Sequence, residues 1–211
     1  MRVGLGTGST VKYTVLELGR RIAEEGLEIV GVPTSVATEN LAKKVGIPLV
    51  ELGLLDGLDI VIDGTDEFDP SFQLIKGGGA ALLREKIVAQ QSAAMVVVAD
   101  HRKQVHCLGA FGIPIEITPF ASDVTVSALS SLLNCEVELR TMEGKHILTD
   151  NGNCIADAQI GPSITDPVAT EAMILNVAGV VQVGLFNNMC DAVVLASESG
   201  VSTLMNPNGR L

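Results

Sequence analysis

The chain has 211 residues, of which 47% are hydrophobic and 18% are charged, and its formal net charge is −11. This composition supports a substantial core in one large domain or two small ones and argues against a disordered chain. The acidic balance argues against nucleic acid as a partner, because phosphate backbones select basic surfaces. An acidic protein can still bind a small anionic substrate if a helix N-terminus and a lysine supply a local positive site.

The four cysteines include no pair at metal-ligand spacing, and the three histidines form no zinc motif. We therefore expect reduced thiols and no bound metal. No apolar run approaches the roughly 18 residues that a membrane span needs, and the first residues lack a signal-peptide pattern. These features predict a cytoplasmic protein with no membrane partner.

Short apolar runs alternate with helical patterns through the first half of the chain, which is the rhythm of a parallel α/β sheet. The expected strands are residues 1–5, 29–32, 47–52, 58–62 and 95–99, and the expected helices are residues 9–25, 36–45 and 80–92. Thr34 or Ser35 is the expected N-cap of the second helix.

After Cys107 the predicted elements become shorter and are separated by prolines. Strands are expected at residues 113–118, 136–140, 146–149 and 155–159, and helices at residues 123–133 and 168–177. This α+β pattern predicts a smaller domain over residues 109–186, inserted into a parallel-sheet domain formed by residues 1–108 and 187–211. The apolar residues 191–196 would return to the first sheet as its last strand.

The first segment with chemical potential is the glycine-rich run of residues 4–10, which follows a strand and opens a helix. Glycines let a backbone approach an anion, and the helix N-terminus offers N–H groups and a favourable dipole. The hydroxyls of Thr7, Ser9 and Thr10 add donors for phosphate oxygens. The alternative is a tight turn capped by Ser9. A dinucleotide site would also want an acidic residue after the second strand, where this chain has Pro33 and Thr34.

Three carboxylates, Asp63, Asp66 and Glu67, crowd into the turn that follows the strand at residues 58–62. In open α/β sheets, ligands bind at the carboxyl ends of strands. Such a cluster could bind a hard cation or perform acid–base work on sugar hydroxyls. The alternative is a solvated acidic turn in which Asp63 serves as a cap.

The run of residues 76–86 is the most informative stretch. Three consecutive glycines, residues 77–79, cost chain entropy and suit a loop whose N–H groups face a ligand. Lys76 stands at the entrance of this loop, and Glu85 lies less than two turns into the helix that follows. The alternative reading makes Arg84, Glu85 and Lys86 an exposed charged face.

Lys103 follows the strand at residues 95–99 and could reach an anion at the same edge of the sheet. Taken alone, an exposed surface lysine is the better explanation of Lys103.

Taken together, these segments resemble the ribose-5-phosphate isomerase A family. The family shows Gly-Thr-Gly-Ser-Thr, Asp-Gly-x-Asp-Glu, Lys-Gly-Gly-Gly running into Arg-Glu-Lys, and Asp-x-x-Lys, and all four motifs occur here in the same order. Further matches begin at Pro33, Pro114, Thr149 and Gly179, so the resemblance covers nearly the whole chain. It departs at the start, because family members usually carry a helix before the strand that begins here at Met1.

The resemblance implies an aldose–ketose isomerase that interconverts D-ribose 5-phosphate and D-ribulose 5-phosphate in the non-oxidative pentose phosphate pathway. It implies a Rossmann-like open parallel sheet domain with a smaller ferredoxin-like α+β domain inserted before the last strand. It also implies no cofactor, no metal, and a homo-oligomer, either a dimer or a tetramer.

The resemblance also implies the site residues. The substrate would be bound by Thr7, Gly8, Ser9, Thr10, Asp63, Gly64, Thr65, Asp66, Lys76, Gly77, Gly78, Gly79 and Lys103. Glu85 would move a proton between C2 and C1, and Lys76 would stabilise the resulting enediolate. Asp63 or Asp66 would open the sugar ring and shuttle protons among hydroxyls.

Three other functions compete with this interpretation. A sugar-phosphate sensor would keep the phosphate loop but would not need Glu85. A nicotinamide dehydrogenase and a metal-dependent isomerase are more distant alternatives. Physical reasoning on the residues does not separate ribose 5-phosphate from arabinose 5-phosphate or an allose phosphate; the resemblance favours ribose.

Overall fold

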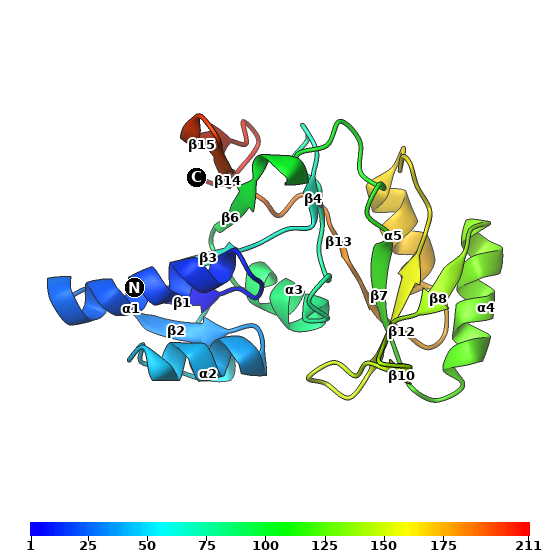
Figure 1. Ribbon diagram of the computed structural model, residues 1–211, viewed down its shortest axis with the longest axis horizontal. Coiled ribbons are helices and arrows are strands. Elements are labelled where there is room, and N and C mark those ends of the chain that lie inside the picture. The colour runs from blue at the N-terminus through cyan, green and yellow to red at the C-terminus, as the bar shows by residue number, and fades with distance from the viewer. The chain divides into compact units, whose positions relative to one another are not determined.

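The computed structural model describes residues 1–211, and its internal contacts divide the chain into two compact units (Figure 1). The first unit comprises Met1–Thr65, Arg84–Arg102 and Asn188–Leu211, and the second comprises Asp66–Leu83 and Lys103–Asn187. This division differs from the predicted boundaries, which assign residues 66–83, 103–108 and 187 to the first domain. In the structure, β4 (Glu67–Phe68) and β5 (Leu74–Ile75) form a sheet with β13 (Leu185–Phe186), far along the chain.

The core of the first unit is a six-stranded sheet in the order β15-β14-β6-β3-β1-β2. The strands are β1 (Arg2–Leu5), β2 (Val30–Pro33), β3 (Ile60–Asp63), β6 (Met95–Asp100), β14 (Ala192–Ser197) and β15 (Gly200–Met205). All neighbours pair in parallel except β14 and β15, which form an antiparallel hairpin. The predicted mixed α/β fold with a parallel sheet is therefore confirmed, and so is the return of residues 191–196 to this sheet beside β6. This strand is not the last one as predicted, because β15 follows it in the chain.

Helices α1 (Val11–Glu25) and α2 (Val36–Lys44) cover one face of this sheet, and α3 (Leu82–Gln90) contributes to the other (Figure 1). Val11 of α1 shares a buried cluster with Val3 and Leu5 of β1. On the opposite face, a Cβ added at Gly4 would lie 2.6 Å from Val88 of α3. The alternation of side chains along a strand therefore places Gly4 toward α3, and Val3 and Leu5 toward α1.

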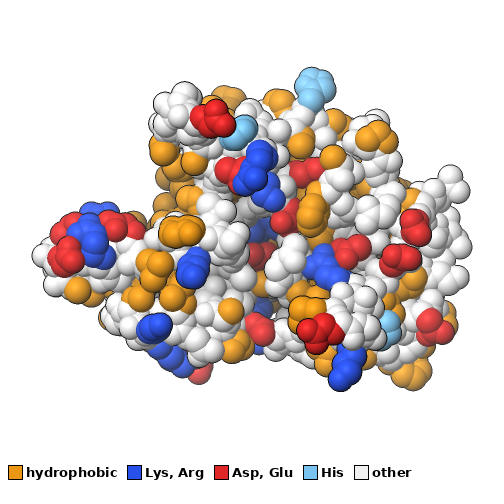
Figure 2. Space-filling model, in the orientation of Figure 1, with side chains coloured by type: hydrophobic (Ala, Val, Ile, Leu, Met, Phe, Trp, Pro, Cys, Tyr) orange, Lys and Arg blue, Asp and Glu red, His pale blue; other side chains and the backbone are white.

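The caps of these helices follow from local chemistry. Ser35 caps α2, because its Oγ accepts a hydrogen bond from the N–H of Thr38 at 3.1 Å. Helix α1 ends at Gly26 in the left-handed region, with φ of 69°. Near the end of α1, Arg20 pairs with Glu17 and Glu24. Basic and acidic side chains gather at this end of the helix (Figure 2).

Two predicted strands are largely wrong. Residues 47–52 form a single bridge between Leu49 and Gly31, followed by the 3-10 turn η1 (Leu52–Leu54). Pro48 has no N–H to donate to a ladder, which limits pairing there. Residues 146–149 contribute the end of β10 (Lys145–His146), which pairs with β9 (Thr141–Met142) in a small separate hairpin, and an isolated bridge between Leu148 and Cys154.

The second unit contains a βαββαβ run whose four strands lie in the order β12-β7-β11-β8. Its elements are β7 (Ile113–Ile117), α4 (Ser122–Leu133), β8 (Val137–Leu139), β11 (Cys154–Ala158), α5 (Pro167–Leu175) and β12 (Val180–Val183). This order and its antiparallel pairing are the ferredoxin-like arrangement that the resemblance implied.

Both helices of this run lie on one face of the four-stranded sheet. Ile113, Ile115 and Ile117 alternate along β7 and share one core with Leu129 of α4 and Ile174 of α5. The intervening residues of β7 and β11 therefore point to the face that carries no helix.

The second unit also contains a three-stranded sheet in the order β13-β5-β4, which was not predicted. Strands β4 (Glu67–Phe68) and β5 (Leu74–Ile75) are too short to give an alternation signal in the sequence. Across both units, none of the helices combines the length and apolar character that spanning a membrane requires.

Candidate functional site

In the first unit, the loop of residues 4–10 is built around the carboxylate of Asp63 at the end of β3. The Asp63 side chain is fully buried, and its Oδ1 accepts hydrogen bonds from the N–H groups of Thr7 at 3.0 Å and Gly64 at 2.7 Å. A Cβ on Gly6 would lie 2.2 Å from the same oxygen, so no other residue fits at that position. The structure thus brings together two of the predicted site segments, the glycine loop and the start of the acidic turn.

A cluster of hydroxyl groups holds the same loop from the other side. The Oγ1 of Thr7 lies 2.7 Å from Oγ1 of Thr34 and 2.8 Å from Oγ of Ser35. Thr38 donates its hydroxyl hydrogen to the carbonyl of Gly6 at 2.9 Å. The hydroxyl of Thr7, expected as a ligand donor, takes part in this cluster, which positions the loop.

Sequence reasoning gave Thr34 and Ser35 only an N-cap role and gave Thr38 none. The available signal was the run of short polar residues directly after β2, at the carboxyl end of a strand. It was interpreted as an N-cap alone, which Ser35 does provide.

The N-terminus of α1 is open for a ligand. Gly8, Ser9 and Thr10 are exposed, and no side chain caps the first turn of the helix. The carbonyl of Gly8 already accepts a hydrogen bond from the N–H of Lys12 at 3.0 Å, so the helical pattern starts within the loop. The alternative of a turn capped by the side chain of Ser9 is wrong. The first-turn N–H groups and the helix dipole together favour an anion.

The three carboxylates of the acidic turn each have different hydrogen-bond partners. Asp63 faces the loop of residues 4–10, whereas Asp66 accepts a hydrogen bond on its Oδ2 from the N–H of Gly78 at 2.7 Å. Glu67 is buried and accepts from the N–H groups of Gly109 at 2.8 Å and Phe111 at 2.5 Å. Although the three carboxylates are close in sequence, each is therefore stabilised by backbone N–H donors from a different segment. Gly64 between them is buried and Thr65 is half-buried.

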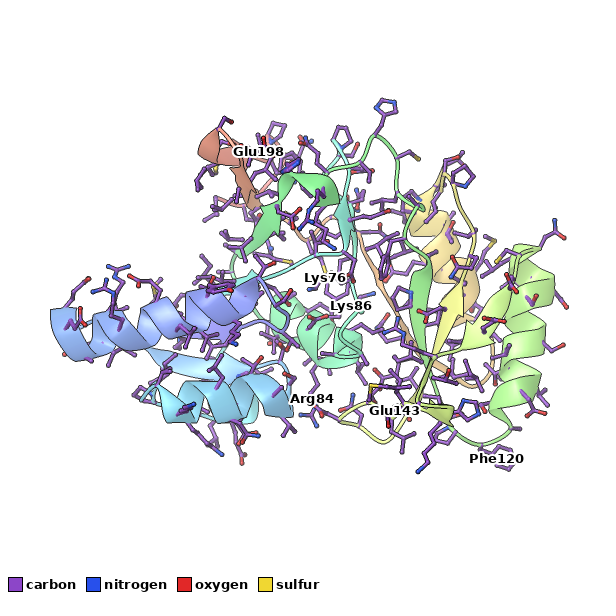
Figure 3. The ribbon with its side chains drawn as sticks, in the orientation of Figure 1. Lys76, Arg84, Lys86, Phe120, Glu143 and Glu198 are labelled. Carbon is purple, nitrogen blue, oxygen red and sulfur yellow. The ribbon has the colours of Figure 1, made fainter.

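Lys76 is the most unusual cation of the second unit. Its side chain (Figure 3) is 2% exposed, and its Nζ lies 5.4 Å from the centroid of the Phe186 ring in β13. The backbone N–H of Lys76 donates to the carbonyl of Gly184 at 2.8 Å, which fixes the start of the loop. The face of an aromatic ring attracts an ammonium group at this distance, which helps to position the side chain. Phe186 is a contact that sequence reasoning missed.

The glycines after Lys76 form a loop with an unusual backbone, in which Gly77 is buried. Gly77 has φ of 113°, and Ala80 also lies at positive φ, 57°. Gly78 and Gly79 are exposed, and Gly78 is tied to Asp66 as described above. The structure thus brings Asp66 together with the residues that follow Lys76.

Glu85 lies in the first turn of α3 and is 4% exposed, and the next residue, Lys86, is 2% exposed. The alternative of an exposed charged face is therefore wrong for both residues, whereas Arg84 is half-buried (Figure 3). Burial of a carboxylate is costly unless charged or polar groups meet it, so such a position indicates a purpose beyond solubility.

Lys103 ends the 3-10 turn η2 (His101–Lys103) and is half-buried. Its neighbour Arg102 is exposed and pairs with Asp100 at 2.8 Å. Arg102 is therefore paired with an acidic side chain, whereas Lys103 has no acidic partner. No group of three His, Cys, Asp or Glu side chains in the chain could hold a metal ion.

Comparison with known proteins gives one consistent result. The family model of ribose 5-phosphate isomerase A (phosphoriboisomerase A) matches residues 30–200. The ribose-5-phosphate isomerase A of Bacillus mycoides is 46% identical over 201 residues, which span 95% of this chain and 90% of that protein.

Solved structures agree. Ribose 5-phosphate isomerase A from Methanocaldococcus jannaschii has a TM-score of 0.91 at 41% identity, covering 97% of this chain and 91% of that one. A ribose-5-phosphate isomerase in complex with phospho-erythronic acid has a TM-score of 0.93 at 39% identity, covering 97% of this chain and 90% of that one.

Proposed function

The chain belongs to the ribose 5-phosphate isomerase A family, and we propose that it interconverts D-ribose 5-phosphate and D-ribulose 5-phosphate without a cofactor or metal. The observation that carries this proposal is the solved relative with bound phospho-erythronic acid. That compound joins a carboxylate to a phosphate in one small molecule. A carboxylate is planar and anionic, as is the enediolate that an aldose–ketose isomerisation would form.

In the proposed mechanism, Glu85 removes the proton from C2 of the open-chain aldose, and the electron pair moves into the C1 carbonyl. The resulting cis-enediolate carries negative charge on oxygen, which the ammonium of Lys76 stabilises. Glu85 then returns the proton to C1, and a proton moves from the C2 oxygen to the C1 oxygen. The atoms and charges of substrate and product balance without an external oxidant.

Two carboxylates have auxiliary roles in this proposal. Asp63 or Asp66 opens the sugar ring and relays protons among the hydroxyls. Both are held by backbone N–H groups, Asp63 by Thr7 and Gly64 and Asp66 by Gly78, which fixes the oxygens that would act. Fixed donors and acceptors cost no reorganisation at the moment of reaction.

The remaining predicted residues bind the substrate. The open N-terminus of α1 at Gly8, Ser9 and Thr10 supports an anchor for the phosphate group. Lys103 would contact the substrate as a further cation, and residues 64–65 and 77–79 would line the sugar. A bound phosphate would hold the reacting carbons at a fixed position relative to the catalytic groups, so that binding energy contributes to the rate of reaction.

The direct test is an assay for ribulose 5-phosphate formed from ribose 5-phosphate by chelator-treated enzyme. We expect turnover that the chelator leaves unchanged. Loss of activity on chelation would favour a metal-dependent isomerase, and no product at high enzyme concentration would favour a sugar-phosphate sensor. Faster turnover of arabinose 5-phosphate or an allose phosphate than of ribose 5-phosphate would identify that sugar as the preferred substrate. Binding of NAD in calorimetry would favour a dehydrogenase.

We also propose that the protein acts in the cytoplasm, in the non-oxidative pentose phosphate pathway. All four cysteines are free thiols, which fits a reducing compartment. A disulfide in the protein isolated from cells under thiol-blocking conditions would contradict this location.

Self-association into a dimer or tetramer is likewise proposed. At the start of α4, Phe120 projects from the fold with 89% of its surface exposed (Figure 3), and Val124 is 64% exposed. Exposed apolar groups of this kind often mark contacts between subunits. A molar mass equal to one chain in light scattering would contradict this proposal.

A further inference from the structure

Arg140, in the segment after β8, has an arrangement that no role assigned above explains. Its guanidinium forms a two-pronged ion pair with Asp157 of β11, with Nε donating to Oδ2 at 2.7 Å and Nη2 to Oδ1 at 2.5 Å. The side chains are 17% and 24% exposed, so water competes little for the pair. Two parallel charge-assisted hydrogen bonds fix the plane of a guanidinium as well as its position.

The third nitrogen of that guanidinium reaches the glycine loop. Nη1 of Arg140 donates to the carbonyl of Gly77 at 2.9 Å and to the carbonyl of Gly78 at 3.0 Å. The backbone of Arg140 is itself fixed, because its N–H donates to the carbonyl of Ile155 at 2.8 Å. One side chain, oriented by Asp157, therefore fixes two successive peptide planes of the loop that follows Lys76.

The orientation of these planes follows from the trans peptide, in which the C=O and N–H point in opposite directions. The plane between Gly77 and Gly78 is held at both ends, by Arg140 at its carbonyl and by Asp66 at its N–H. In the next plane, Arg140 holds the carbonyl of Gly78, so the N–H of Gly79 is directed away from Arg140. Gly79 is exposed, and its N–H is therefore presented to solvent or to a ligand.

We propose that Arg140 and Asp157 are a positioning pair that holds residues 77–79 in one conformation, so that the N–H of Gly79 donates to an anionic oxygen of the substrate. Three consecutive glycines would otherwise sample many conformations. The identity of the ligand, a sugar phosphate, rests on the proposed function. The positioning role concerns the loop itself and can be measured by binding as well as by turnover.

The chain contains a matched control. Arg210 pairs with Asp191 through Nη2 to Oδ2 at 2.7 Å and Nε to Oδ1 at 3.1 Å. It also donates to two backbone carbonyls, those of Ser92 at 3.1 Å and Met189 at 2.8 Å. Arg210 thus repeats the chemistry of Arg140, but none of its partners is a predicted site residue.

The experiment compares wild type with Arg140→Ala, Arg140→Lys, Asp157→Asn and Arg210→Ala. Each is titrated with phospho-erythronic acid by calorimetry and assayed with ribose 5-phosphate. We expect Arg140→Ala to weaken binding and lower kcat/KM by about 10- to 100-fold, because small misplacements of binding groups cost rates of that order. Asp157→Asn should lower affinity and kcat/KM less than Arg140→Ala does. Arg210→Ala should keep affinity and kcat/KM close to those of wild type.

Chemical rescue separates positioning from stability. Guanidinium at millimolar concentration should restore part of the affinity and kcat/KM of Arg140→Ala and should change neither wild type nor Arg210→Ala. Arg140→Lys keeps the charge without the fork, so it should fold and still bind phospho-erythronic acid more weakly than wild type. Thermal unfolding of each variant monitors folding, and if Arg140→Ala does not fold, the Arg140→Lys titration decides.

The proposal is overturned if folded Arg140→Ala or Arg140→Lys binds phospho-erythronic acid as wild type does. It is also overturned if Arg210→Ala loses as much affinity as Arg140→Ala, because the effect would then be general destabilisation. Absence of isomerase activity in the wild type would instead count against the proposed function, while the titrations would still test the positioning pair.

Discussion

Two glycine-rich segments, residues 4–10 and residues 76–79, are held in place by different chemistry. The first rests on a buried carboxylate, Asp63, and on a cluster of neutral hydroxyls that includes Thr7. The second is fixed by Asp66 at one N–H and by the guanidinium of Arg140 at two carbonyls. The first segment leaves the N-terminus of α1 without a side-chain cap, and in the proposed function this end anchors the phosphate.

The second segment carries the charges that the reaction needs. Lys76 precedes its glycines and Glu85 follows them in the first turn of α3, and both side chains are buried. In the proposed mechanism, the first segment anchors the phosphate, whereas the second both lines the sugar and supplies the groups that act on the reacting carbons. Substitutions in residues 4–10 should therefore act mainly on KM, and substitutions in residues 76–85 mainly on kcat.

The largest effect is expected from Glu85→Gln. Removing a general acid–base group typically costs about 10²- to 10⁴-fold in rate, so kcat should fall by at least that order. The amide keeps nearly the same shape, so phospho-erythronic acid should still bind. Single-turnover kinetics and calorimetry measure both quantities. Near wild-type turnover would remove Glu85 from the mechanism and favour its structural role.

Lys76→Met is expected to have the next largest effect. Methionine keeps most of the apolar stem beside Phe186 but removes the charge, so the protein should fold and lose about 10²- to 10³-fold in kcat, as for other groups that stabilise a developing oxyanion. Steady-state kinetics separate kcat from KM. A rise in KM at unchanged kcat would make Lys76 a phosphate contact and would erase the difference between the two segments.

The double substitution Ser9→Ala and Thr10→Val tests the first segment. Each hydroxyl lost from a phosphate site removes a hydrogen bond of about 0.5–1.5 kcal/mol, so KM should rise roughly tenfold while kcat changes little. Gly8 and the backbone N–H groups remain, which limits the loss. A fall in kcat larger than the rise in KM would assign chemistry to this segment as well.

The smallest effect on activity is expected from Arg210→Ala, which should change stability instead. Burial raises the pKa of the Asp191 carboxyl, but hydrogen bonds from the side chain and backbone N–H of Arg210 and from the N–H of Met95 outweigh it and hold the pKa below its ordinary value. This contribution to stability is complete above the unfolded carboxyl pKa of about 3.9 and is lost as the pH falls through the depressed folded value.

Arg210→Ala should therefore lower the free energy of unfolding at neutral pH by about 1–3 kcal/mol, and the difference from wild type should shrink in acid. Urea unfolding at several pH values measures it. Arg2→Ala is the control, because Arg2 and Asp59 form a comparable but exposed pair whose loss should matter little. A stability difference that stays constant as the pH falls would contradict the role of the Asp191 charge.

Much of the fold could be predicted from periodicity. The strands around Val3, Val61 and Val97 are continuous apolar runs, and α1 and α4 have long regular patterns. Strands of two residues, such as β4 and β5, leave no periodic signal and depend on pairing with β13. The same pairing places residues 66–83 in the second unit, which no local pattern indicates.

The site was predictable to the extent that ligand-binding backbone needs glycine. The glycines at 77–79 and the carboxylates at 63 and 66 indicated ligand loops directly. The residues that support these loops, such as Thr38, Arg140 and Phe186, lie far away in sequence and have ordinary neighbours. Their roles depend on which strands are adjacent, so only the folded structure identifies them.

The most direct test of the central claim follows the transferred hydrogen. Chelator-treated wild-type enzyme is given ribose 5-phosphate in D₂O, and the sugar is observed by NMR. A proton that passes through Glu85 can exchange with solvent, so we predict ribulose 5-phosphate with deuterium at C1. Ribulose 5-phosphate without any deuterium would indicate a direct hydride shift, and absence of ribulose 5-phosphate would contradict the isomerase itself.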